Sequence, residues 1–418
     1  MMSGAKKMVP KRRFKEFLNA GDWEQRKLGD FTTQINTFVN PEDAKLPLWS
    51  LTAEAGLIGK TDRYERDFLV KKKDQFKRIE TNTLVYNPMN ITIGSIDIYT
   101  GLYPIAVSGY YVSIVYDKNI DTDFLKEVLL LPSSLKMYKN YATGSLIERQ
   151  RVQYPTFSKL QLLFPNLDEQ RAIGQLFKSL NLNITLHQRK LDKLQATKKA
   201  LLQEMFPEEG QDKPKRRFKG FTDAWKQRKL SELATMNARI GWQNLRTSEF
   251  LDSGDYLLIT GTDFDNGRIK YSTCHYVEKK RFDQDTKIQL STGSILITKD
   301  GTLGKVAIVE ELPKPATLNA GVFNVRVKDN TLLSYKYLYH YLKAPFLMKY
   351  VTANATGGTI KHLNQSILVD FPIPIAEKHE QDKITKLLDS LESIITLHQR
   401  KLDKLKNLKQ AYLNEMFV

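Results

Sequence analysis

The sequence contains one stretch of eleven residues twice, and this repeat limits the folds that the chain can adopt. The stretch ITLHQRKLDKL occupies residues 184–194 and returns unchanged at 395–405. Over the longer windows 184–206 and 395–417, 17 of 23 positions are identical. The segments KRRFK and W-x-QRKL also occur twice, in the same order, ahead of each copy of the stretch. We therefore interpret the chain as two copies of one unit.

The copies are alike at their ends and unlike in between. Residues 29–165 and 231–373 share almost no identity, and the second block is 9 residues longer because the offset grows from 202 at Trp23 and Trp225 to 211 at the helix repeat. Both blocks nevertheless contain two matching segments whose β-branched residues predict strands. These segments are 82–87 and 109–119 in the first copy, and 293–298 and 321–330 in the second. The pattern predicts an α+β protein with two mixed α/β domains that share a framework and differ in their surface residues.

The repeated segments predict two long helices with a coiled-coil seam. Asn166 and Glu169 form a capping-box pattern at the start of the first helix, expected over 168–206, whereas the second copy lacks this cap. Apolar residues then recur at alternating spacings of 4 and 3, the 3.5-residue period of a coiled coil. The predicted seam residues are Ile173, Phe177, Leu180, Ile184, Leu191, Leu194, Leu201 and Met205, and Ile384, Leu388, Leu391, Ile395, Leu402, Leu405, Tyr412 and Met416.

Four polar residues fall on this seam, namely His187, Lys198, His398 and Lys409. They could form a polar layer that fixes the register of the helices, or they could tilt out to solvent. We favour the second interpretation because coiled-coil seams often tolerate a polar residue. Neither histidine has a cysteine or carboxylate at metal-ligand spacing, so zinc is not expected.

The length of the linker predicts how the helices run. A helix over 168–206 is roughly 58 Å long at 1.5 Å per residue. The linker after Pro207, even with the basic segment included, reaches only ~38 Å. It cannot return the second domain to the start of the first helix. We therefore expect the helices to pair antiparallel, with one domain at each end and a pseudo-twofold axis between them.

The charge of the chain favours a polyanionic partner. Lysine and arginine number 64 against 47 acidic residues, a formal net charge of +17. Each contact with a phosphate releases counterions and adds affinity regardless of sequence. Ribosomal, membrane-surface and DNA-binding proteins all fit this balance.

Neither a membrane span nor a disulfide framework is expected. No run approaches 18 apolar residues, and the first residues lack the apolar core of a signal peptide. The single cysteine, Cys274, excludes an internal disulfide and a CxxC zinc site, and we expect a buried or half-buried thiol on a strand. A cytoplasmic location is the expectation.

No catalytic motif is complete in this sequence. The segment NPMN at 87–90 differs at both diagnostic residues from the Asn-Pro-Pro-aromatic loop of amino-methyltransferases. The segment 299–309 has Lys299 where a phosphate loop needs glycine, and it predicts instead a hairpin that turns at Asp300–Gly301. We expect no catalytic and no metal-ligating residue in this chain.

The arrangement of the repeated segments resembles a known family. Two variable α/β domains, each preceded by W-x-QRKL and followed by an ITLHQRKLDKL helix, resemble the specificity subunit of type I restriction–modification systems, the HsdS family. The resemblance covers residues 11–418, and the helix motif is similar to that of staphylococcal and other Gram-positive members.

This resemblance implies a function for each part. The variable blocks would be target recognition domains, each reading one half of a bipartite double-stranded DNA target. The helices would set the spacing of the two halves and dock two methyltransferase subunits, which in turn recruit the restriction subunits. The chain itself would be non-catalytic and would bind no cofactor, and adenosylmethionine, ATP and magnesium would be bound by the partner subunits.

The implied domains follow the repeat. They are a basic N-terminal arm (1–22), recognition domain 1 (23–165), spacer helix 1 (166–206), a linker with a second basic arm (207–222), recognition domain 2 (223–375) and spacer helix 2 (376–418).

Three rival interpretations stay open. A stand-alone architectural DNA-binding protein would not need such similar helices beside such dissimilar domains. A fused restriction–methylation enzyme would need catalytic motifs that the sequence lacks. The chain could also be a similar subunit of another restriction–methylation system.

Basic and amide side chains near the predicted strand ends are the candidates for DNA contacts, with Lys and Arg suited to phosphates and Asn and Gln to base edges. In the first domain they are Lys71, Lys72, Lys73, Lys77, Arg78, Asn87, Asn90, Ser95, Thr143, Arg149 and Arg151. In the second they are Arg239, Trp242, Gln243, Asn244, Arg246, Lys299, Thr302, Lys305, Thr359, Lys361, His362 and Asn364. For each lysine, a solvated surface charge is the alternative.

Overall fold

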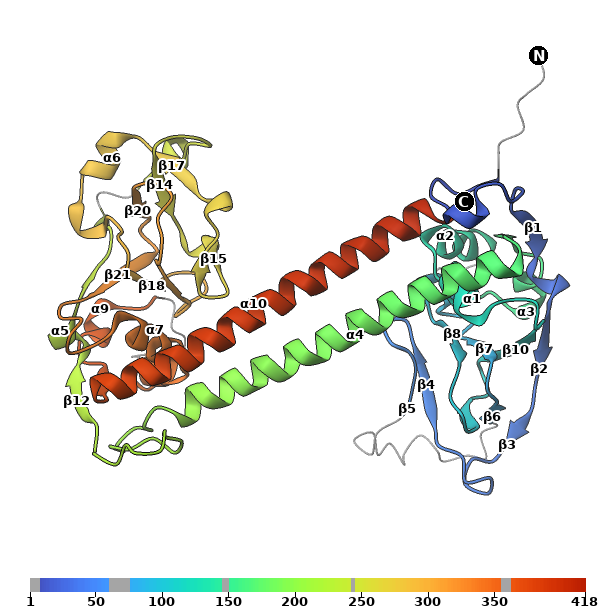
Figure 1. The fold of residues 1–418 in the computed structure, drawn as a ribbon, viewed down its shortest axis with the longest axis horizontal. Coiled ribbons are helices and arrows are strands. Elements are labelled where there is room, and N and C mark those ends of the chain that lie inside the picture. Colours follow the sequence, from blue (N-terminus) through green and yellow to red (C-terminus); the bar gives the residue numbers. More distant parts are fainter. Residues whose placement is uncertain (1–7, 60–75, 145–149, 242–244, 355–361) are drawn as a thin grey trace, which may run out of the picture. The chain divides into compact units, whose positions relative to one another are not determined.

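The structure, a computed structural model, describes residues 8–59, 76–144, 150–241, 245–354 and 362–418 (Figure 1). The chain forms two compact units. The first comprises Met1–Gln188 and Arg400–Val418, and the second comprises Arg189–Gln399. Each unit contains one mixed domain and a part of each long helix.

A four-stranded antiparallel sheet, in the order β2-β10-β7-β8, forms the centre of the first unit. Its strands are Thr32–Ile35 (β2), Thr83–Tyr86 (β7), Ile96–Tyr99 (β8) and Val112–Tyr116 (β10). Every residue of β7 and β8 is buried, because the sheet carries a core on each face. This double burial explains why Leu84, Val85 and Tyr86 are apolar in succession rather than alternating with polar residues.

Shorter sheets and helices cover this centre. The sheets are β1 (Glu24–Lys27) with β11 (Gln161–Phe164), β3 (Phe38–Val39) with β6 (Phe76–Ile79) and β9 (Ile105–Ser108), and β4 (Trp49–Thr52) with β5 (Gly56–Gly59). The α-helices are α1 (Thr122–Leu129), α2 (Pro132–Tyr141) and α3 (Tyr154–Phe157). The 3-10 helices are η1 (Lys15–Phe17), η2 (Leu28–Asp30) and η4 (Ile91–Ile93).

The second unit repeats the central sheet in the order β13-β21-β18-β19. Its strands are Ala234–Asn237 (β13), Ile295–Thr298 (β18), Val306–Ile308 (β19) and Val322–Val327 (β21), again all antiparallel. The strands predicted from the four apolar segments are thus present at matching places in the two sheets. The common framework predicted for the variable blocks is confirmed.

The remaining elements of the second unit differ more from the first. Its other sheets are β12 (Lys226–Lys229) with β22 (Pro372–Ile375), β17 (His275–Val277) with β14 (Tyr256–Ile259) and β20 (Ala316–Leu318), and β15 (Phe264–Asp265) with β16 (Arg268–Ile269). The α-helices are α5 (Leu230–Leu233), α6 (Lys279–Asp283), α7 (Tyr335–Lys343), α8 (Phe346–Asn354) and α9 (Gln365–Leu368). The 3-10 helices are η7 (Thr247–Glu249), η8 (Gly261–Asp263), η9 (Tyr271–Thr273) and η10 (Thr286–Ile288).

The length difference between the copies lies between the first two framework strands. Thr32 and Ala234, which begin β2 and β13, are 202 positions apart, and Thr83 and Ile295, which begin β7 and β18, are 212 apart. Because Pro88 and Lys299, just after these two strands, are 211 apart, the 9 additional residues of the second copy precede β18, in the region that contains β14 and β17. Cys274 lies in this region and is buried as predicted, but it precedes β17 by one residue instead of lying on the strand.

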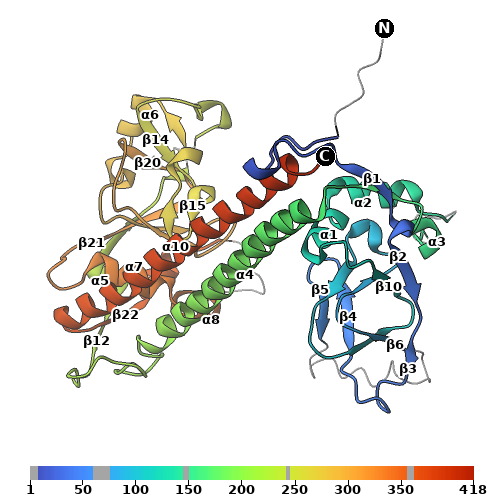
Figure 2. The same ribbon diagram turned by 45° about the vertical axis from the view of Figure 1, so that its right-hand side comes forward.

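Each long helix has 38 residues: α4 spans Leu167–Glu204 and α10 spans Lys378–Glu415 (Figure 2). The side chain of Asn166 caps α4, because its Oδ1 accepts a hydrogen bond from the Glu169 backbone N–H at 2.9 Å. The predicted return bond from Glu169 is replaced by another contact, since its carboxylate pairs with Arg13. Among the described residues, no helix is long and apolar enough to cross a membrane.

Within each unit the two long helices lie antiparallel. In the first unit, Phe177 lies 5.6 Å from Phe417 between ring centroids, and one turn further along α4 Asn181 meets Lys409 of α10 at 2.7 Å. Of the sixteen predicted seam residues, ten are buried and six are half-buried, and none is exposed. The half-buried ones are Ile184, Leu194, Leu391, Ile395, Leu405 and Tyr412.

The two seam lysines form polar layers, which corrects the expectation that they tilt out to solvent. Lys198 Nζ lies 2.6 Å from Glu392 Oε1, and the side chains are only 17% and 9% exposed. Lys409 Nζ donates to Asn181 Oδ1 at 2.7 Å. Lys198 and Lys409 are 211 positions apart, and so are their partners Glu392 and Asn181. The layer therefore occurs once in each unit. A buried polar group needs its partner, and such a layer therefore selects one register of the helices.

The segment KRRF is repeated because it holds the start of a long helix in each unit. Arg13 donates to both carboxylate oxygens of Glu169 at 2.7 and 2.6 Å, and Arg217 does the same with Glu380 at 2.7 and 2.9 Å. Both carboxylates are buried, with side chains 1% exposed. We call this pair of contacts the arginine clasp. Bidentate geometry makes it one of the stronger kinds of ion pair.

The preceding arginine makes a second contact, with the end of a helix. Arg12 N donates to Glu415 O at 2.8 Å and Arg216 N donates to Glu204 O at 2.8 Å. The Arg12 and Glu415 side chains also pair, as do those of Arg216 and Glu204. The KRRF segment thus joins the start of one long helix to the end of the other in each unit.

Removing the arginine of the clasp should destabilise the first unit strongly. Arg13→Met leaves Glu169 buried without its counter-charge, and we expect a loss of about 3–5 kcal/mol in the free energy of unfolding. The control is the neighbouring Arg12→Met, whose pair with Glu415 is exposed and should cost about 1 kcal/mol or less. Denaturant unfolding measures both, and equal losses for the two variants would contradict the assignment of the clasp.

The polar layer of the second unit should make its stability depend on acid. Burial alone would raise the pKa of Glu392, but Lys343 and Lys198 outweigh burial and lower the pKa from 4.5 to about 2. Because the pKa is lower in the folded state, this carboxylate contributes stability above pH 4.5 that is lost as the pH falls toward 2, on the order of 3 kcal/mol at most. Glu392→Gln should be less stable than the unaltered protein at pH 7, and the difference should shrink on acidification. A constant difference from pH 7 to pH 3 would show that Glu392 is not held by the lysines.

Candidate DNA interface

The topology of each central sheet brings the predicted contact segments to one end. In the first unit, β10 and β8 begin where β7 ends, because Val112 pairs with Tyr86 and Tyr86 pairs with Ile96. The loop 87–95 and the turn 109–111 therefore lie at the same end of the sheet. In the second unit the same strand order places the loops 299–305 and 319–321 together. We call this end of each sheet the loop end.

A further segment is held against each loop end by the same backbone hydrogen bond. Val152 N donates to Pro88 O at 3.0 Å in the first unit, and Leu363 N donates to Lys299 O at 2.8 Å in the second. The two donor residues are 211 positions apart, and so are the two acceptor residues. The hydrogen bond therefore belongs to the framework that the units share. It carries Arg151 to the loop end of the first unit, and His362 and Asn364 to that of the second.

The loop end of the first unit presents amide, basic and apolar side chains. Asn90 and Arg151 are exposed, and Thr143 pairs with Arg151 through two backbone hydrogen bonds of 2.9 Å. Asn87 supports the loop, because its Oδ1 accepts from the Met89 N–H at 3.0 Å. Gly94 ends η4 with a φ of 97°, a conformation that favours glycine.

The loop end of the second unit is a hairpin with basic and hydroxyl side chains. The segment 299–305 joins β18 to β19, as predicted, and Gly301 and Gly304 in it have φ of 70° and 71°. Thr302, Lys305 and Asn364 are exposed. His362 Nδ1 pairs with Asp300 Oδ1, and this pair links the hairpin to the neighbouring segment. Lys299 is half-buried, with its ammonium 5.7 Å from the ring centroid of Phe323.

Three predicted contacts are instead buried in the domains. Lys77 donates to Tyr111 O at 2.7 Å, and its burial lowers the pKa of the ammonium group. Arg239 is 2% exposed, donates from Nε to Leu318 O at 2.9 Å, and has its pKa lowered by burial. Ser95 is also 2% exposed. These side chains support the fold, and their burial keeps them from direct contact with DNA.

Two of the other predicted arginines differ in whether their side chains are engaged. Arg78 pairs with Glu80 across two positions. Arg246 is exposed, and its backbone N–H donates to Glu249 at 2.8 Å. The remaining predicted residues, namely Lys71, Lys72, Lys73, Arg149, Trp242, Gln243, Asn244, Thr359 and Lys361, lie outside the described residues.

The structure adds apolar residues to the loop end of the first unit that the sequence analysis missed. Tyr110, in the turn before β10, is 90% exposed, and Met89 and Ile93 in the loop 87–95 are 48% and 66% exposed. Exposed apolar side chains of this size beside amide and basic groups suit contact with base edges and thymine methyl groups. Only the strand register could have indicated Tyr110, because it lies far in sequence from Asn90.

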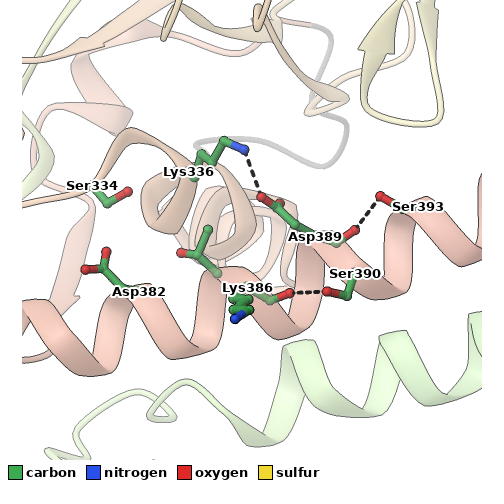
Figure 3. A pocket seen from close by; sticks show the side chains of 8 residues that line it. Ser334, Lys336, Asp382, Lys386, Asp389, Ser390 and Ser393 are labelled. Atoms are coloured by element: carbon green, nitrogen blue, oxygen red, sulfur yellow. Dashed lines mark hydrogen bonds and ion pairs between the residues drawn. The ribbon is translucent and has the colours of Figure 1, made fainter.

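The described residues contain no group of three or more His, Cys, Asp or Glu that could hold a metal ion. A polar pocket of about 400 Å³ lies between α7 and α10 in the second unit (Figure 3). Its lining combines serine and threonine hydroxyls with two lysines and two aspartates. Lys336 and Asp389 in this lining form an ion pair of 2.9 Å, so both charged groups are engaged with each other.

Comparisons with known proteins agree with this geometry. Residues 222–407 match the model of the type I restriction modification DNA specificity domain. The chain is 25% identical over 146 residues to the Type I restriction enzyme EcoR124I/EcoR124II specificity subunit of Escherichia coli, which is 35% of this chain and 36% of that protein. It is 25% identical over 158 residues to the putative type I restriction enzyme MjaX specificity subunit of Methanocaldococcus jannaschii, or 37% of each.

The whole fold is also known from a solved structure. The crystal structure of the S subunit of a type I restriction-modification system from M. genitalium matches with a TM-score of 0.66 at 14% identity, over 98% of this chain and 99% of that one. The chain is therefore similar to type I specificity subunits, in sequence over part of its length and in fold over nearly all of it. The sequence alignments span about a third of the length of the curated relatives. The likeness to Gram-positive members stays a prediction.

Neutralising a basic residue at the loop end should weaken DNA binding in a salt-dependent way. Arg151→Ala should reduce the slope of log affinity against log salt by about 1, because one phosphate contact is lost. Lys118→Ala is the matched control, since Lys118 is an exposed lysine after β10, at the opposite end of the same sheet. Binding to labelled duplex DNA at several salt concentrations measures both. Equal effects of the two variants would place the interface elsewhere on the domain.

Proposed function

We propose that this chain is the non-catalytic subunit that supplies DNA sequence specificity to a type I restriction–modification complex. The loop end of each central sheet reads one half of a bipartite double-stranded DNA target. One observation carries the proposal: the two units share a framework sheet and a backbone hydrogen bond at the loop end, yet present different side chains there. Two domains that recognise different half-sites need a common framework and different side chains at the contact surface.

The chemistry of the loop ends supports contact with DNA. Arginine and lysine suit phosphates and guanine, and asparagine suits the edge of adenine. Arg151 and Asn90 in the first unit, and Lys305 and Asn364 in the second, are exposed and carry these groups. The net charge of +17 adds affinity for any phosphate backbone.

The spacer helices α4 and α10 have a second role in this proposal, which is to dock two methyltransferase subunits and to set the distance between the half-sites. The repeated motif exposes the same side chains in each copy, including Leu186 and Leu397 at 53% and 57%. Its basic residues Lys193 and Lys404 are also exposed. Identical exposed surfaces are needed where the same partner binds twice.

In this proposal the methyltransferase subunits recruit the restriction subunits, and the complex works in the cytoplasm. Adenosylmethionine, ATP and magnesium are bound by those partners. A stand-alone architectural DNA-binding protein is the alternative, but it gives no reason for two identical exposed helix surfaces. A similar subunit of another restriction–methylation system would share the sheets and helices and differ only in its partners.

Exchange of one variable block tests the proposal. Replacing residues 29–165 with the corresponding block of another family member should change one half of the methylated sequence and leave the other half unchanged, because each loop end reads its half independently. Genome-wide mapping of methylated sites in a host that carries the partner subunits measures the result. The matched control is the same exchange over 231–373, which should change only the other half.

Two outcomes would contradict the proposal. One is a change in both half-sites after a single exchange. The other is methyl transfer by the purified chain alone with adenosylmethionine, which would show that the chain is an enzyme.

A further inference from the structure

The first helix after each central sheet joins its domain to the spacer through one contact that is the same in both units. Gln170 of α4 accepts a hydrogen bond from the Asp121 N–H at 3.0 Å, at the N-cap of α1. Gln381 of α10 accepts from the Ser334 N–H at 2.9 Å, at the N-cap of α7. The two glutamines are 211 positions apart. This contact fixes α1 and α7 in the same place on the spacer, so the charges that follow can be compared position by position.

The first charged contact has opposite polarity in the two units. Asp123, the second residue of α1, pairs with Lys178 of α4 at 2.8 Å. Lys336, the second residue of α7, pairs with Asp389 of α10 at 2.9 Å, as Figure 3 shows. Lys178 and Asp389 are 211 positions apart. The domain supplies the acid in the first unit and the base in the second.

The charges of the buried polar layer are also exchanged between the domain helix and the spacer. In the first unit Glu127 of α1, with a side chain 7% exposed, lies 3.2 Å from Lys409 and accepts from the Asn181 amide at 2.6 Å. In the second unit Lys343 of α7 pairs at 2.8 Å with Glu392, which also holds Lys198.

The equivalent positions of this layer define what changes. Lys409 and Lys198 are the same position and keep their charge, whereas Asn181 is replaced by Glu392. The carboxylate has therefore moved from the domain helix to the spacer, and an ammonium group stands on the domain helix instead. Tyr339 of α7 completes the layer in the second unit, with its hydroxyl 3.3 Å from Glu392 Oε1.

We propose that these reversed charges assign each domain to its own half of the spacer. The face formed by Lys178, Asn181 and Lys409 accepts a domain whose first helix is acidic. The face formed by Asp389, Glu392 and Lys198 accepts a domain whose first helix is basic. The first face thus fits a recognition domain with an acidic first helix, and the second face fits one with a basic first helix. The same rule applies to a domain acquired from another chain by exchange.

The physical reason is the high cost of like charges in the buried layer, because the outer pairs, Asp123 with Lys178 and Lys336 with Asp389, are partly exposed and contribute less. A domain of the first kind placed on the second face would bring Asp123 to Asp389 and Glu127 to Glu392. A domain of the second kind on the first face would bring Lys336 to Lys178 and Lys343 toward Lys409. Unpaired or repelling charges that are largely buried are strongly destabilising, and repulsion is an efficient way to reject a wrong partner.

A double-mutant cycle in the full chain tests the buried layer. Glu127→Lys should lower the melting temperature of the first unit by about 5–10 °C, because it places an ammonium group beside Lys409. Asn181→Glu alone should also lower it, since two carboxylates then lie in contact. The double variant restores a pair of opposite charges with the polarity of the second unit, although its lysine stands one turn earlier on the helix than Lys343, and it should recover at least half of the larger loss. The control, Lys139→Glu on the exposed face of α2, should shift the melting temperature by no more than about 1 °C.

The cycle can overturn the proposal. If the double variant loses as much as the sum of the two single variants, the charges do not recognise one another, and the assignment fails.

A chimera tests the assignment of whole domains. In it, residues 231–373 replace residues 29–165, so that a basic domain helix meets the first face. The same chimera with Lys178→Asp and Asn181→Glu on the spacer presents the second kind of face. The matched chimera should melt at least about 5 °C above the unmatched one and resist proteolysis longer. Equal stability of two folded chimeras would overturn the proposal, and if neither folds, the double-mutant cycle decides.

These measurements are independent of DNA. They report only how a domain is held on the spacer, whereas the proposed function is tested by the methylated sequence. Failure of one can therefore be told from failure of the other.

Discussion

The arginine clasp is the contact on which the rest of each unit depends. Arg13 with Glu169, and Arg217 with Glu380, are buried pairs that join the basic segment to the first turn of a long helix. In the second unit the Trp225 indole N–H also donates to Glu380 at 3.0 Å, so three parts of the chain meet at one carboxylate. In the first unit the Trp23 indole N–H has no partner among the described residues. The clasp therefore tolerates the loss of its third member but not of its arginine, because an unpaired buried carboxylate costs far more than an unmade neutral hydrogen bond.

Much of this fold could be predicted from the repeat, because repeated residues are those whose contacts recur. The helix bounds, the antiparallel pairing and the framework strands all follow from period and spacing, which are local properties of the chain. The second sheets could not be predicted in this way, since β14 pairs with β20 in parallel across more than fifty residues, and no local pattern specifies such a partner. The seam lysines were misjudged for a similar reason: the partner of Lys198 is Glu392, almost two hundred positions away.

The candidate interface was predictable in its loops but not in its individual side chains. Turn residues and strand ends indicated the segments 87–95 and 299–305, and the strand order brings each of them to a loop end. Burial decided the rest. Lys77 and Arg239 are residue types that suit contact with phosphates, yet both donate hydrogen bonds to backbone carbonyl groups inside the domain. Tyr110 has no distinguishing local pattern, and it is nevertheless the most exposed large hydrophobic residue of the described chain.

The placement of these features explains how one chain can change what it reads without losing its fold. The clasp, the glutamine contact at the N-cap and the polar layer all lie where the domain meets the helices, and no residue of the loops 87–95 and 299–305 takes part in them. Substitutions of exposed residues in these two loops therefore leave the buried ion pairs intact, because all the paired residues lie elsewhere in the chain. The charges on α1 and α7 are under a different constraint: they can vary only together with the spacer residues that they meet. The residues proposed to contact DNA can therefore vary independently, whereas the charges on α1 and α7 must match those of the spacer. The sign of these charges decides which half of the spacer can hold a given domain.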